Sequence, residues 1–129
     1  MRTYDPYALY KKTKIETSSP AELVSLLYDE AIKCCKMANR AIEAKKIDSA
    51  HTNLVKVQDI LDELSCSINT ENGGEVAENL LALYGYMKRR LIEGNIKKDT
   101  AIISEVYELF ASLRQTWQEA MKIGNKENA

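Results

Sequence analysis

Four segments of the chain each place apolar residues about every three or four positions, and no other feature limits the fold so strongly. In the second segment the series is Ala50, Leu54, Val57, Leu61, Leu64 and Ile68. Because an α-helix has about 3.6 residues per turn, this spacing aligns the side chains in one stripe along a helix. The other series are Val24, Leu27, Ala31, Cys34, Ala38 and Ala41; Val76, Leu80, Leu83, Tyr84, Met87 and Leu91; and Ile103, Val106, Phe110, Leu113, Trp117 and Met121. The spacing predicts an all-α chain, and no segment has a strand pattern.

Capping residues set the expected limits of the first two helices. Ser19 is a favoured N-cap and begins a capping box, and Pro20 suits the first helical position. The first helix should therefore begin there and run to about Lys45. Asp48 is a suitable N-cap for the second helix, which is expected to cover about residues 49–67.

Glycines and polar residues set the limits of the other two helices. The third helix should follow the polar run 69–74, which contains two glycines, and end near residues 94–95. Asp99 is a candidate cap for the fourth helix, and Gly124 is its expected stop. Residues 124–129 are then expected to form a disordered tail.

The number and length of these helices predict one architecture for the whole 129-residue chain. Four helices of about 20 residues with short connections most simply form a single-domain, antiparallel up-down-up-down four-helix bundle. Residues 1–18 lie outside the four stripes. Asp5 and Pro6 favour a helical turn there that would place Tyr7 and Tyr10 on one side. We therefore expect a short N-terminal helical arm packed onto the bundle.

Charge and hydropathy exclude several classes of function. The chain has 18 Lys and Arg residues against 19 Asp and Glu residues, a formal net charge of −1, so it lacks the positive field on which general nucleic-acid binding depends. It also contains no apolar run of about 18 residues, and residues 1–14 alternate Tyr with Lys and Arg in place of a signal peptide's apolar region. A cytoplasmic location is expected, with no nucleic-acid partner and no membrane insertion.

The residues needed for metal binding or catalysis are sparse. Cys34 and Cys35 point about 100° apart on a helix. With Cys66 the chain has three cysteines, an odd number, and we expect all three to be reduced. A zinc site with His51 would need a fourth ligand and a paired spacing that the chain lacks, so His51 is expected at the surface. There is no P-loop, no GxGxxG and no nucleophile elbow. Neither an enzyme nor a bound cofactor is predicted.

The apolar residues of the first three helices spread beyond a single stripe. The fourth helix keeps its large apolar residues within about 120°, apart from Tyr107 and some terminal residues. The displaced residues of the other helices are Leu26, Tyr28, Ile32, Val55, Ile60, Ala77, Leu81, Tyr86 and Ile92. Such a surface either marks a partner site or is covered by the tyrosine-rich arm. With no sheet edge available, the expected partner is an amphipathic helix or a wrapped chain segment.

Motifs over nearly the whole chain resemble those of the FliS family of flagellin-specific export chaperones. They are DPYALYK (5–11), TSSP (17–20), KVQDILDEL (56–64), GGEVAENL (73–80) and LYGYMKRRL (83–91), together with Leu23, Leu27, Tyr28, Asp29 and Trp117. The chain departs from the family pattern at Glu30, Gly85 and Gly94, which are expected at turn or surface positions.

The resemblance implies a non-catalytic cytoplasmic chaperone. Such a protein binds the disordered C-terminal segment of flagellin, prevents premature polymerisation and delivers the subunit to the flagellar export apparatus without a nucleotide. A self-associating structural bundle, a homodimer without a flagellin client, is the alternative from a different functional class.

The resemblance and the displaced apolar positions together predict the partner-binding residues. They are Tyr7, Tyr10, Leu23, Tyr28, Ile60, Leu64, Asn79, Leu81 and Tyr84. Core packing is the alternative for Leu64 and Tyr84, and plain exposure is the alternative for Asn79. In the family the N-terminal arm lies over part of the partner's site, so Tyr7 and Tyr10 either compete with flagellin as a plug or contact it. Ile60 and Leu81, as displaced residues, are predicted to accept aspartate without loss of the fold.

Overall fold

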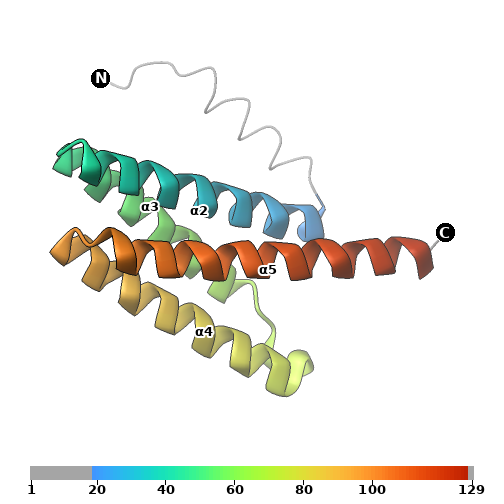
Figure 1. The fold of residues 1–129 in the computed structure, drawn as a ribbon. Coiled ribbons are helices and arrows are strands. Elements are labelled where there is room, and N and C mark those ends of the chain that lie inside the picture. Colours follow the sequence, from blue (N-terminus) through green and yellow to red (C-terminus); the bar gives the residue numbers. More distant parts are fainter. Residues whose placement is uncertain (1–18, 128–129) are drawn as a thin grey trace, which may run out of the picture.

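The computed structural model describes residues 19–127, and this part of the chain is four helices joined by short turns, with no strand. The helices are α2 (Pro20–Glu43), α3 (Ile47–Cys66), α4 (Thr70–Lys97) and α5 (Thr100–Glu127). Successive helices run in opposite directions (Figure 1). Each packs against the next, and α5 returns to pack against α2, so the helices form a ring around one core. The all-α four-helix bundle is confirmed; the predicted N-terminal arm lies outside the described residues.

The first helix begins where its caps predict and is followed by a tight reversal. The Ser19 side chain accepts a hydrogen bond from the backbone N–H of Glu22 at 3.2 Å. After Glu43, Lys45 takes a left-handed conformation (φ 61°), and the N–H of Lys46 donates to the Ala41 carbonyl at 2.7 Å. Because the chain turns within these few residues, α3 begins at Ile47 with Lys46 as its N-cap. The prediction of Asp48 as the N-cap is wrong. Its carboxylate lies in the first turn, where its negative charge interacts favourably with the positive end of the helix dipole.

The expected break between the second and third helices consists of residues 67–69 and a kink at one glycine. Gly74 has φ 57° and ψ −139°, a backbone conformation that side chains with a Cβ disfavour. Residues 70–73 before it, predicted to be loop, form a helical turn. The Asn69 side chain caps this turn by accepting from the N–H groups of Glu71 and Asn72 at 3.0 and 3.3 Å.

Gly94 has a packing role that differs from the predicted one. The helix does not end there but continues to Lys97, and Lys98 takes the left-handed conformation after it. Gly94 is buried, and a Cβ at this position would lie 3.1 Å from Ile103 Cγ1 and 3.2 Å from Ile102 Cγ2. The expected turn or surface position is therefore wrong, because the missing side chain allows close approach of α4 and α5.

The fourth helix begins as predicted and extends further than predicted. Asp99 accepts from the N–H of Ala101 at 2.9 Å, which confirms it as a cap. Gly124 does not end α5, which continues to Glu127, so the first residues of the predicted disordered tail are helical. One glycine inside a helix costs only about 1 kcal/mol relative to alanine, which is too little to stop a long helix.

Small side chains on α2 let its neighbours approach closely along the middle of the core. Ala31, Cys34, Cys35 and Ala38 are at most 2% exposed. They pack in one cluster with large buried side chains from the other three helices: Leu54, Leu61, Leu64, Met87, Leu91, Ile103, Val106 and Phe110. The core is thus continuous between the helices.

Burial predicts a sharp difference in reactivity among the three free cysteines. Cys34 and Cys35 are buried, whereas Cys66 is exposed. Burial, reinforced by the neighbouring Cys34 thiol, raises the pKa of Cys35 to about 12. At neutral pH we expect a chromogenic disulfide reagent to modify only Cys66 in the folded protein and all three thiols in urea. The Cys66→Ser variant should then show no rapid reaction, and rapid modification of a second thiol in the folded protein would contradict this packing.

Candidate partner-binding site

The two ends of the bundle differ in how completely their apolar side chains are buried. At the end where α2 meets α3 and α4 meets α5, which we call the sealed end, Ile42 is half-buried against the core, and Ile47 and Ile96 are exposed on the helix surface. At the opposite end, a larger set of apolar side chains from α2, α4, α5 and the α3–α4 connection is only half-buried. We call these residues the open-end cluster: Val24, Leu27, Ile68, Leu80, Leu83, Leu113 and Trp117. Each packs against the core on one side and meets solvent on the other.

Polar contacts hold α2 and α5 together at the open end. The indole N–H of Trp117 donates to the carbonyl of Ala21 at 3.0 Å. Arg114 pairs with Asp29 at 3.3 Å. The C-terminal half of α5 is therefore fixed along the start of α2.

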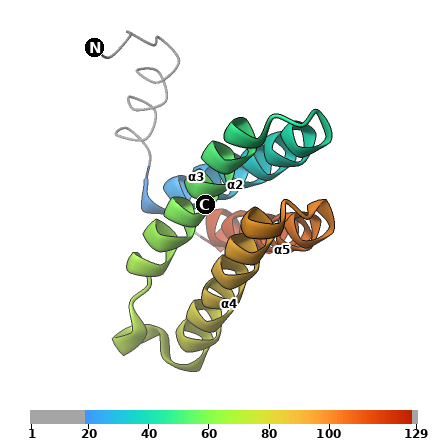
Figure 2. The same cartoon turned by 90° about the vertical axis from the view of Figure 1, so that its left-hand side faces the viewer.

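The N-terminal half of α4 has no comparable attachment to α5. Tyr86 and Arg90 both donate to Glu105, at 2.8 and 2.7 Å, and the Arg90 hydrogen bond lowers the pKa of that carboxyl. Before Tyr84, however, no side-chain hydrogen bond or ion pair joins α4 to α5 among the side chains that the structure describes. The two helices diverge toward the start of α4 (Figures 1 and 2). Leu80 and Leu83 of the open-end cluster lie on this part of α4.

A pair of buried tyrosines marks the border between the sealed core and the open end. The hydroxyl oxygens of Tyr28 on α2 and Tyr84 on α4 lie 2.6 Å apart, and the Tyr28 ring packs 6.3 Å from that of Phe110. Both residues are at most 3% exposed. Burial is the main reason that the pKa of each tyrosine is raised. This polar link joins two helices that are not neighbours in the ring.

The tyrosine pair gives a stability prediction. Tyr28→Phe or Tyr84→Phe should each lower the free energy of unfolding by about 1–3 kcal/mol, because the remaining hydroxyl is buried without its partner. The double variant should lose less than the sum, since no unpaired hydroxyl remains. Urea unfolding of the four proteins measures this coupling. Strict additivity would show that the two hydroxyls do not interact.

The same pair predicts a pH dependence. Both pKa values are raised above the tyrosine value of about 10, so folding favours the protonated phenols. Their contribution to stability should be complete below about pH 10 and be lost as the pH rises above it. Urea unfolding at neutral pH and above pH 10 should show a steeper loss for the natural chain than for the double phenylalanine variant. Equal losses would contradict the assigned burial.

The structure separates the predicted partner-binding residues into three groups. Tyr7 and Tyr10 lie outside the described residues. Tyr28, Ile60, Leu64 and Tyr84 are buried. Leu23 and Leu81 are half-buried beside the open-end cluster, and Asn79 is exposed on the same part of α4. Partner contact by these residues stays a prediction.

The apolar residues predicted to lie outside the core stripes divide into three classes, of which one, Leu26 and Leu81, is half-buried. Tyr28, Ile32, Ile60 and Ala77 are at most 7% exposed, so their surface assignment is wrong. Each helix of the ring packs against two neighbours, and its buried arc is therefore wider than a single stripe. Val55, Tyr86 and Ile92 are exposed as predicted.

Sequence reasoning missed the open-end cluster because its members lie in the same stripes as the sealed core. A usable signal is the size of the stripe residues along α2. They change from Val24 and Leu27 to alanine and cysteine, and large residues keep neighbouring helices further apart. Stripe position alone does not report this change along the bundle axis.

Little in the described part of the chain suggests other kinds of site. His51 is exposed as predicted, with its Nδ1 3.0 Å from the side-chain nitrogen of Asn95. No three His, Cys, Asp or Glu side chains within residues 19–127 are grouped so that they could hold a metal ion. Over the same residues, no helix combines the length and the apolar character needed to cross a bilayer.

Comparisons with known proteins agree with the motifs and the fold. A family model described as "Flagellar protein FliS" matches residues 3–124. The "Flagellar secretion chaperone FliS" of Bacillus subtilis (strain 168) is 33% identical over 127 residues, which cover 98% of this chain and 94% of that protein. The protein of the same name from Salmonella typhimurium is 31% identical over 109 residues, covering 84% of this chain and 81% of its own. A solved structure titled "Crystal structure of flagellar chaperone from bacteria" has the same fold, with a TM-score of 0.75 over 90% of this chain and 94% of that chain at 17% identity. The chain therefore belongs to the flagellar protein FliS family.

Proposed function

We propose that the chain is a cytoplasmic flagellar secretion chaperone that binds the disordered C-terminal segment of flagellin at the open end of the bundle. Binding prevents premature polymerisation, and the complex delivers flagellin to the export apparatus without catalysis. The observation that carries the proposal is the open-end cluster, where large apolar side chains from several elements share one incompletely buried surface. Membership of the FliS family, with relatives named flagellar secretion chaperones, supports a flagellar client.

Burial of this surface can offset the cost of ordering a flexible client. A segment that is disordered when free loses conformational entropy on binding, so its partner must offer a long apolar contact. Full burial of one leucine contributes about 1.5–3 kcal/mol, and covering a half-buried one contributes about half of that. Trp117 and Leu113 on α5 face the same end as Leu80 and Leu83 on α4, so one bound segment would cover several of these side chains.

The predicted contact residues have different roles in this proposal. Leu23, Asn79 and Leu81 contact the client beside the open-end cluster. The buried predicted residues instead support that surface by packing beneath it in the core: Tyr28, Ile60, Leu64 and Tyr84. Tyr7 and Tyr10 precede α2, whose first turn lies at the open end, so the arm either covers the surface as a plug or joins the client there.

Calorimetric titration with the C-terminal segment of the cognate flagellin tests the proposal. We expect stoichiometric binding with a negative heat-capacity change, the mark of apolar burial. A scrambled segment of the same composition is the control. No heat at several temperatures, together with no co-elution, would overturn the assignment of this client.

Two further measurements test the role of the N-terminal arm and the alternative of a self-associating bundle. A variant lacking residues 1–14 should bind more tightly if the arm is a plug and more weakly if the arm contacts flagellin. Light scattering measures the size of the protein with and without the segment. A tight dimer that persists when the segment is added would favour the self-associating bundle over the chaperone.

A further inference from the structure

The start of α4 extends past the end of its neighbour α3 (Figures 1 and 2). An ion pair of 2.7 Å between Asp62 and Lys88 fixes how these two helices lie side by side. Four residues further along α3 and four back along α4 place Cys66, the last residue of α3, beside Tyr84. Residues 75–79 lie more than one helical turn beyond that level. We call residues 75–79 the overhang of α4.

The connection from α3 covers one side of the overhang. Gly74, with φ 57° and ψ −139°, bends the chain between the helical turn 70–73 and the rest of α4. A Cβ on Gly73 would lie 2.6 Å from Ala77 Cβ, so this turn packs directly against Ala77. Ala77 is accordingly only 7% exposed. Because a Cβ at Gly73 would collide with Ala77 and one at Gly74 would disfavour the bend, the two glycines hold this arrangement.

The adjacent side chain of the overhang is left uncovered by the described part of the chain. Val76 is 77% exposed, although it belongs to the apolar stripe of α4. It precedes Leu80 by four residues and Leu83 by seven, so the three side chains share one face of the helix. Leu80 and Leu83 are members of the open-end cluster. Val76 therefore extends the apolar face of that cluster by a further turn.

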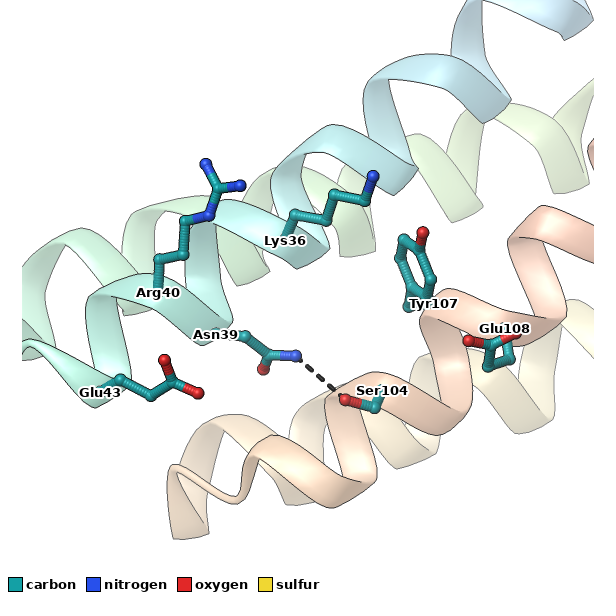
Figure 3. Close-up of a pocket in the computed structure, with 7 residues that line it drawn as sticks. All are labelled: Lys36, Asn39, Arg40, Glu43, Ser104, Tyr107 and Glu108. Atoms are coloured by element: carbon teal, nitrogen blue, oxygen red, sulfur yellow. Dashed lines mark hydrogen bonds between the residues drawn. The ribbon is translucent and has the colours of Figure 1, made fainter.

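The cleft between α2 and α5 offers no comparable apolar contact (Figure 3). Its seven lining residues include two cations, two carboxylates and one aromatic residue, Tyr107. The charges balance, and the Asn39 side-chain N–H donates to Ser104 Oγ within the protein at 3.1 Å. A client that binds through apolar burial gains more from the overhang than from this cleft.

We propose that Val76 contacts the client and that Gly73 and Gly74 position it. The inference rests on the proposed function: the occupant is the flagellin segment, and one of its large aliphatic side chains packs on Val76 in continuity with the contact at Leu80. A second copy of the chain fits this surface less well. Stable dimers bury about 800 Å² on each partner, and the overhang has one exposed apolar side chain of this size to offer.

Calorimetric titration of the full chain with the flagellin segment tests the contact. Val76→Asp should weaken binding about 30-fold or more, because the apolar contact is lost and the new carboxylate must be dehydrated. Its melting temperature should stay within about 3 °C of the natural value, since Val76 is exposed. Val76→Leu adds one methylene and should tighten binding about two- to fourfold.

Ala82→Asp is the matched control for the charge. Ala82 is exposed on the same helix and points about 120° away from Val76. A carboxylate there should change the affinity by no more than about threefold.

Gly74→Ala tests the positioning role. Because alanine disfavours a φ of 57°, the overhang should shift and the affinity should fall about five- to tenfold. The double variant with Val76→Asp should bind no more than about twofold more weakly than Val76→Asp alone, since Gly74 acts through Val76. A loss that came only from lower stability would reduce the affinity by the same factor in both backgrounds.

The outcomes separate this inference from the proposed function. Unchanged affinity in a folded Val76→Asp protein would overturn the contact and leave flagellin as the client, whereas no binding by the natural chain would overturn both. An effect of Val76→Asp that disappears in the variant lacking residues 1–14 would assign Val76 to the N-terminal arm and also overturn the client contact. Additive losses in the double variant would overturn the positioning role of Gly74.

Discussion

Replacement of Ile60 with aspartate should unfold the bundle at neutral pH. Ile60 is 7% exposed and belongs to the core cluster beside Leu61, Leu64 and Tyr84. Loss of a buried isoleucine side chain costs about 2–5 kcal/mol, and an unpaired carboxylate in its place adds several more. A domain of this size is stable by about 5–15 kcal/mol, so the two costs together remove most or all of it. Far-UV circular dichroism and thermal melting measure the outcome.

Two matched variants separate the charge from the loss of packing. Val55→Asp makes an equivalent change on the same helix at a position that is 36% exposed, and it should change the free energy of unfolding by less than about 1 kcal/mol. Ile60→Val keeps the site apolar and should cost only about 0.5–1.5 kcal/mol. A folded Ile60→Asp protein with an unchanged melting temperature would restore the surface position that the helical wheel predicts.

The helices themselves were predictable because their apolar spacing is long and regular. Some of their ends were predictable as well: Ser19 and Asp99 carry side chains that satisfy free N–H groups, and both cap as expected. The start of α3 was not, because the chain reverses at Lys45, a residue with no particular preference for a positive φ. The reversal is a helix cap held by backbone hydrogen bonds from Lys45 and Lys46 to Ile42 and Ala41, and such a cap at an ordinary residue leaves no mark in the local sequence.

Glycine has three different roles in this chain, which explains the other errors at helix ends. Gly74 breaks a helix through its positive φ. Gly94 makes room for Ile102 and Ile103 of the facing helix, and Gly124 lies within α5. A single sequence shows the same letter in each case, since the contact that distinguishes them is made by a residue distant along the chain.

The candidate site was only partly predictable for a related reason. A helical wheel shows which residues share a face, but not how many neighbouring helices cover that face or how deeply a residue lies along the bundle axis. Ile60 lies outside its stripe and is buried, whereas Leu113 lies within its stripe and is half-buried. The burial of Ile60 depends on the ring of four helices. The partial exposure of Leu113 depends on the divergence of α4 from α5 (Figure 2).

Replacement of Leu81 with aspartate should abolish binding of the flagellin segment and leave the bundle folded. Leu81 is half-buried on the N-terminal part of α4, beside the open-end cluster and outside the core cluster. The variant loses an apolar contact and places a carboxylate in an interface that binding dehydrates, a combined loss of about 3 kcal/mol or more, which is about 100-fold or more in affinity. Because the residue borders solvent in the free protein, the free energy of unfolding should fall by less than about 1.5 kcal/mol.

Ile96→Asp is the matched control for that experiment, because it makes an equivalent change on the same helix at the sealed end, where Ile96 is 80% exposed. Titration of both variants with the flagellin segment should show about 100-fold weaker binding for Leu81→Asp and no more than about a threefold change for Ile96→Asp. Equal losses in the two variants would mean that the client contacts α4 along its whole length. Retained binding by a folded Leu81→Asp protein would remove this part of α4 from the site, since no dehydrated apolar interface accepts an unpaired carboxylate without a large loss of affinity.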